Sequence, residues 1–83
     1  MSGKLKEREF YRGFGARCRV AREVRGMTQG HLAKLVGLTR TSIVNMEQGV
    51  QGIPLHRMVR LSKALGVSYK LLLDGQSLRG RNA

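Results

Sequence analysis

Arg40 and Asn45, near the middle of the sequence, have side chains of the types that bind nucleobase edges. An arginine can donate two hydrogen bonds to O6 and N7 of guanine, and an asparagine can bond N6 and N7 of adenine. Val44 lies beside Asn45, and an apolar side chain of this kind can contact the methyl group of thymine. This combination predicts contact with base pairs in a groove of duplex DNA.

The spacing of these side chains fits one face of a helix. Residues three and four apart are neighbours on a helix surface, and this spacing relates Thr41, Val44, Asn45 and Gln48. Ile43 and Met46, also three apart, lie on the opposite side and are expected to anchor the helix to a core. One face is therefore free for a ligand while the other is buried.

The charge of the chain favours a polyanionic partner. Sixteen Lys and Arg against five Asp and Glu in 83 residues give a net charge of +11. Residues 1–25 and 53–83 each carry a net charge of +5, whereas residues 26–52 carry only +1. We therefore expect a central element that contacts bases, flanked by basic elements that hold phosphates.

The composition limits the other functions open to the chain. Its length allows one small domain, and Cys18 with two histidines at unrelated positions makes no zinc site, so we expect no metal or cofactor. No apolar run approaches the roughly 20 residues that span a bilayer, and the start of the chain lacks a signal-peptide core. We expect a cytoplasmic protein with no membrane partner and, without a separate ligand domain, no small-molecule effector.

Apolar periodicity and turn residues predict helices and no strands. The expected helices span about 10–25, 29–36, 40–48, 54–65 and 69–73, with Thr28, Thr39 and Ser68 as N-caps. The side chains expected to face inward are Phe10, Phe14, Cys18, Ala21 and Val24 in the first helix and Leu55, Met58, Val59, Ser62 and Leu65 in the fourth. Residues 1–9 are expected to form a flexible basic arm, 10–75 the domain, and 76–83 a flexible basic tail.

Residues 28–47 have the pattern of a helix-turn-helix motif. Ala33 is small at the point where the two helices would cross, and Gly37 lies in a three-residue turn where a positive φ is expected. In this motif the second helix enters the major groove.

Further motifs in register lie between Gly26 and Ser68, within a family resemblance that runs from about Phe14 to Gly75. They are Gly26-Met27-Thr28-Gln29, Leu32-Ala33, Gly37-Leu38-Thr39, Ser42-Ile43, Met46-Glu47-Gln48-Gly49, Pro54 and Ala64-Leu65-Gly66-Val67-Ser68. In these motifs the chain resembles the Cro/CI-like (lambda-repressor-like, XRE) family of transcriptional regulators. The resemblance implies an all-α, compact five-helix bundle, encoded by a bacterium or phage and associated with the nucleoid, which binds a palindromic operator as a homodimer and represses transcription.

The resemblance also implies roles for single residues. Arg40, Thr41 and Asn45 would contact bases together with Val44, Gln29 would contact a phosphate, and Arg22 would form a structural ion pair with Glu47. We further expect phosphate contacts from Thr39, Ser42, Gln48 and Gln51. Because three consecutive leucines cannot all face one core, we expect a dimer contact that uses Leu71, Leu73 and Leu78.

One departure from the family concerns the loop after the third helix. That loop often carries cations, but here it is Val50-Gln51-Gly52-Ile53. Phosphate contacts from this loop would therefore come from backbone N–H groups.

Two alternatives remain open. The chain could be an antitoxin or another small regulator that acts through a protein partner, although only about eight residues follow Gly75. It could also be a basic protein that binds nucleic acid, RNA included, without sequence preference, or a scaffold. An enzyme is the last choice, because no nucleophile–base pair, metal cluster or phosphate loop is present.

Overall fold

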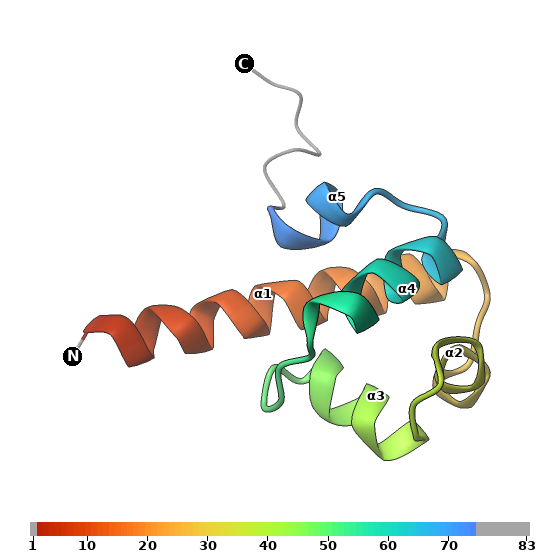
Figure 1. The fold of residues 1–83 in the computed structure, drawn as a ribbon, viewed down its shortest axis with the longest axis horizontal. Helices are drawn as coiled ribbons and strands as arrows, with labels where there is room; N and C mark the ends of the chain where they lie inside the picture. The colour runs from red at the N-terminus through yellow and green to blue at the C-terminus, as the bar shows by residue number, and fades with distance from the viewer. Residues whose placement is uncertain (1, 75–83) are drawn as a thin grey trace.

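The computed structural model describes residues 2–74, which form five helices and no strand (Figure 1). The helices are α1 (Ser2–Val24), α2 (Gln29–Val36), α3 (Arg40–Glu47), α4 (Leu55–Leu65) and α5 (Tyr69–Leu73). α1 packs against α3, α4 and α5, and α2 packs against α3 and α4. In Figure 1, α3 and α5 lie on opposite sides of α1. The expected all-α, five-helix fold is confirmed.

The first helix is longer than the apolar pattern predicted. It begins at Ser2, so residues 2–9, expected as a flexible arm, continue the helix. Residues 4–9 are Lys, Glu, Arg and Leu, which are good helix formers, and no proline interrupts them. The N-terminal half of α1 therefore extends past the rest of the bundle (Figure 1). The expected tail, residues 76–83, lies outside the described residues.

All five helices contribute to one core. Its buried apolar residues are Phe14, Cys18, Leu32, Ala33, Val36, Ile43, Met46, Met58, Leu61, Leu65 and Leu72. Burial, helped by the nearby Glu47 carboxylate, raises the pKa of the Cys18 thiol to about 12, so Cys18 is a protonated core side chain. Within the described residues, no helix combines the length and the apolar character needed to cross a membrane.

Four apolar residues expected inside lie at the surface instead. Phe10, Val24, Leu55 and Val59 are 40, 80, 72 and 41% exposed. Phe10 lies near the projecting half of α1, Val24 and Leu55 occupy helix ends, and Val59 lies beside the buried stripe of α4. Leu61, which was not among the residues expected inside, is fully buried. Periodicity predicted an apolar stripe on these helices, but the predicted stripe was wider than the buried one. In α4 it was also displaced, because it included Val59 and omitted Leu61.

A glycine permits close contact between α1 and α3. A Cβ atom at Gly15 would lie 2.7 Å from the carbonyl oxygen of Glu47 and would also meet the carbonyl oxygen of Met46. Only a residue without a side chain lets the two backbones approach this closely. Gly15 therefore sets the distance between the longest helix and α3.

Candidate nucleic-acid interface

Local hydrogen bonds fix the ends of α2 and α3. The Oγ1 atoms of Thr28 and Thr39 accept hydrogen bonds from the backbone N–H groups of His31 and Ser42, each at 3.0 Å. Gly37 ends α2 with φ = 72°, the left-handed conformation that glycine adopts without strain. Both expected N-caps and the expected positive φ at Gly37 are confirmed, and together they set the geometry of the turn.

An arginine from α4 also holds this turn. The Nη1 atom of Arg57 donates to the carbonyl oxygens of Val36 at 2.8 Å and Gly37 at 3.0 Å. These oxygens belong to the end of α2, where carbonyls lack partners within the helix. Helical spacing predicts only that Arg57 lies outside the apolar stripe of its helix. It does not predict the contact with Val36 and Gly37, because residues 21 and 20 positions apart give no local signal.

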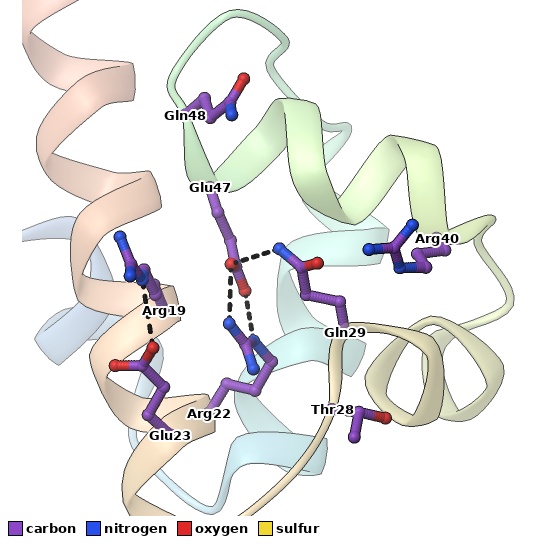
Figure 2. A pocket seen from close by; sticks show the side chains of 8 residues that line it. All are labelled: Arg19, Arg22, Glu23, Thr28, Gln29, Arg40, Glu47 and Gln48. Carbon is purple, nitrogen blue, oxygen red and sulfur yellow. Dashed lines mark hydrogen bonds and ion pairs between the residues drawn. The ribbon is translucent and has the colours of Figure 1, made fainter.

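A buried ion pair connects α1 to α3. Arg22 Nε donates to Glu47 Oε2 at 2.6 Å and Nη2 donates to Oε1 at 3.1 Å, while Nη1 donates to the Met27 carbonyl at 2.8 Å (Figure 2). The two side chains are only 10% and 3% exposed. The hydrogen bond to Glu47 raises the pKa of Arg22 above its ordinary value. The expected ion pair is therefore present, and its arginine is held in the charged form.

Gln29, expected at a phosphate, also contacts this pair. Its Nε2 atom donates to Glu47 Oε1 at 3.1 Å (Figure 2). Glu47 thus holds side chains from both α1 and α2, and it lies at the C-terminal end of α3. The three helices around the motif are fixed relative to one another through one carboxylate.

The outer face of α3 is open. Arg40 and Thr41 are exposed, Val44 and Asn45 are half-buried, and Ile43 on the opposite side is fully buried. Within residues 2–74, none of the four candidate base-contacting side chains forms a hydrogen bond or an ion pair. The structure therefore leaves them available for a ligand, and their contact with bases stays a prediction.

The candidate phosphate contacts fall into three places. Gln29 and Gln48 line a polar cleft of about 500 Å³ together with Arg19 and Arg40 (Figure 2). Gln51 lines a separate groove beside α1. At the start of α3, Thr39 Oγ1 donates to Ser42 Oγ at 3.1 Å, which leaves the Ser42 hydroxyl hydrogen free to donate to an anion.

The structure separates the leucines of α5. Leu72 is fully buried, Leu73 packs against the core, and Leu71 lines an apolar groove of about 500 Å³ with Val20 and Val24 of α1. The carbonyl oxygens of Leu72 and Leu73 accept hydrogen bonds from Arg17 at 2.7 and 3.0 Å, another arginine contact that the sequence did not predict. Leu78 lies outside the described residues. Of Leu71 and Leu73, Leu71 is therefore the better placed for contact with a second chain.

A short turn between two capped helices, the second with one buried and one exposed face, defines the class of helix-turn-helix proteins. The family model for this helix-turn-helix domain, HTH_3, matches residues 19–72, which is more than half of the chain. The chain belongs to this family, as the resemblance to Cro/CI-like regulators implied. Proteins of this class are DNA-binding regulators of transcription.

Solved structures of related proteins support the assignment. The restriction-modification controller protein C.AhdI from Aeromonas hydrophila is 32% identical with a TM-score of 0.72, and the match covers 75% of this chain and 94% of that one. The P22 c2 repressor, solved with a synthetic operator, gives the same four values. A hypothetical transcription factor from Neisseria is 28% identical with a TM-score of 0.77 and coverage of 88% and 86%. None of the curated proteins matches the sequence significantly.

Proposed function

We propose that the chain is a cytoplasmic transcriptional repressor without enzymatic activity, which binds a specific duplex DNA operator in a bacterial or phage genome. The observation that carries the proposal is the outer face of α3, where Arg40, Thr41, Val44 and Asn45 form no side-chain hydrogen bond or ion pair within residues 2–74. Ile43 and Met46 hold the opposite face in the core with 0% exposure. A helix fixed in this way can enter the major groove without rearrangement.

The ends of α2 and α3 support phosphate contacts on either side of the bases. Neither helix has an acidic residue in its first turn. Helix N-termini are partly positive and commonly carry such a residue. A DNA phosphate can supply the missing negative charge. Gln29 and Arg40, at the first positions of these helices, border the same polar cleft. We assign this cleft to the DNA backbone.

The comparisons favour duplex DNA over the alternatives. The P22 c2 repressor, 32% identical, has a structure in complex with a synthetic operator. Nothing in the structure of residues 2–74 favours an antitoxin role or RNA as ligand. Equal affinity for random RNA and random duplex DNA would favour the non-specific alternative, and co-purification of a second polypeptide would favour the antitoxin.

We also propose that two copies bind a palindromic operator, with half-sites roughly 34–36 Å apart, one turn of the duplex. The apolar groove at Leu71, Val20 and Val24 supports this proposal, because it is an exposed apolar surface away from α3. A second copy would cover this groove through a two-fold contact. Leu73 would contribute from its partly exposed side.

Selection of bound sequences from a random duplex library tests base recognition, symmetry and half-site spacing together. Arg40→Ala and Asn45→Ala should then each lose roughly 1–3 kcal/mol of affinity for the selected duplex and relax preference at particular base pairs. Lys63→Ala, at an exposed cation of α4 that lines neither the polar cleft nor the apolar groove, serves as the control. An equal loss for every sequence with Arg40→Ala would contradict base contact by that residue, and recovery of no preferred sequence would contradict the proposed function.

A further inference from the structure

The loop between α3 and α4 has no cation, yet it packs directly on a cation-bearing part of α1. Residues 49–54 contain no Lys or Arg. A Cβ atom at Gly49 would lie 2.9 Å from the backbone nitrogen of Arg12 and 3.2 Å from its Cβ. Arg8 lines a groove of about 390 Å³ with Val50 and Gln51 of the loop. The positive charge missing from the loop is thus present beside it.

Three arginines of α1 form a row on this side of the helix. At 100° per residue, Arg8, Arg12 and Arg19 fall within about 40° of one another. Gly15, which contacts the C-terminal end of α3, lies on the same side. All three arginines are exposed, and Arg19 also borders the polar cleft with Gln48. We call this row the arginine ridge (Arg8, Arg12 and Arg19). It follows α1 past the end of α3.

The arginines of the ridge differ from those that have structural partners. Arg17, Arg22 and Arg57 donate to backbone carbonyls, and Arg22 also to Glu47. Arg8 and Arg12 have no ion pair or hydrogen bond within residues 2–74. Arg19 has an exposed pair with Glu23 at 3.1 Å, and the Arg19 side chain remains 63% exposed. Such a pair contributes little to stability and can exchange its partner.

Acidic side chains near the ridge do not cancel its charge. Glu7 lines the groove with Arg8 but points about 100° away from Arg8 around the helix, as successive residues do. Glu9 lies about 100° from Arg8 on the other side and about 60° from Arg12, three residues on, but it forms no ion pair within the described residues. Glu23 is adjacent to Arg19 alone. The ridge therefore presents net positive charge along α1 beside the loop.

We infer that the arginine ridge binds the phosphates of the DNA backbone next to the C-terminal end of α3, in place of cations in the loop. Guanidinium groups suit this role, because they bond phosphate oxygens in pairs. The inference rests on the proposed function, since it places the duplex against the outer face of α3. It assigns to the projecting half of α1 a role in affinity and none in base preference.

The test compares two double variants that remove the same charge. Arg8→Gln/Arg12→Gln changes the ridge, and Lys63→Gln/Lys70→Gln changes two exposed cations that line neither the polar cleft nor the apolar groove. Affinity for a mixed-sequence duplex is measured at several salt concentrations, with circular dichroism as a check of folding. The ridge variant should reduce the magnitude of the negative slope of log K against log salt by about 0.9 for each phosphate that a protomer no longer neutralises. The control should change the slope much less.

A second variant separates charge from side-chain loss. Arg8→Lys/Arg12→Lys should keep the salt slope near that of the native protein, because lysine still neutralises a phosphate. Equal slopes for the ridge and control variants would overturn the inference while leaving base recognition by α3 intact. Failure of the native protein to prefer any duplex sequence would instead count against the proposed function and not against the ridge.

Discussion

Glu47 is the only acidic residue between 26 and 52, and its carboxylate accepts hydrogen bonds from two other helices. Charge alone does not explain an acid beside a surface proposed to bind DNA. Its burial does, because the buried Arg22 guanidinium requires a partner of opposite charge. The role of Glu47 is therefore to fix the position of α3 and not to bind the ligand directly.

Removing this carboxylate should be severely destabilising. Glu47→Ala leaves the Arg22 guanidinium buried without a counter-ion, and we expect a loss of about 3–5 kcal/mol in the free energy of unfolding. Urea unfolding followed by circular dichroism measures it. Glu23→Ala is the matched control, because it removes the exposed partner of Arg19 and should cost at most about 1 kcal/mol. Similar losses for the two variants would show that the buried pair has no special role.

At the scale of elements, the position of α3 depends on a backbone contact with α1 at Gly15 as well as on side chains. The Gly13-Phe14-Gly15 segment fits no nucleotide-binding loop, because no strand precedes it. Its function is packing, with Phe14 in the core and Gly15 against α3. A change in the distance between α1 and α3 would move the C-terminal end of α3 and the loop that follows it.

Gly15→Ala should therefore destabilise the fold although alanine is the better helix former. The added methyl group must push α3 away from α1, and we expect a loss of about 1–3 kcal/mol. Gly30→Ala is the control, because a Cβ atom there meets nothing within 4 Å, and it should be neutral or stabilising by up to about 1 kcal/mol. Thermal unfolding compares the two. A stabilised Gly15→Ala variant would contradict the close packing of α1 on α3.

At the scale of the whole molecule, the basic and apolar surfaces separate. The arginine ridge and the polar cleft border α3, whereas the apolar groove lies among α1, α4 and α5. α3 and α5 lie on opposite sides of α1 (Figure 1). A second copy can therefore cover the groove without competing with DNA.

Leu71→Asp should convert a dimer into a monomer, because it places a charge in the apolar groove that we assign to the second copy. Analytical ultracentrifugation measures the change, and circular dichroism checks the fold. Leu55→Asp, at a residue 72% exposed at the far end of α4, should leave the dimer intact. A native protein that sediments as a monomer both free and on DNA would refute the dimer proposal.

The sequence by itself predicted the five helices, apart from the first residues of α1, and the residues of the candidate site. Helix ends follow from local signals, such as Thr28, Thr39 and Gly37, which act within a few residues of themselves. The candidate base contacts follow from residue type and helical spacing in the same way. The ion pair of Arg22 with Glu47 could be predicted because the family resemblance implied the pairing.

Only the tertiary structure decided which residues of the same type hold the fold together and which are exposed to a ligand. Composition cannot distinguish Arg17 and Arg57, bonded to carbonyls 55 and 21 residues away, from Arg8 and Arg12, which are open to solvent. Periodicity predicted an apolar face for each helix, but the neighbouring helices decided that Leu61 is buried and that Leu55 and Val59 are exposed. The physical reason is the same in each case, since burial and long-range hydrogen bonds depend on which elements meet and not on local sequence.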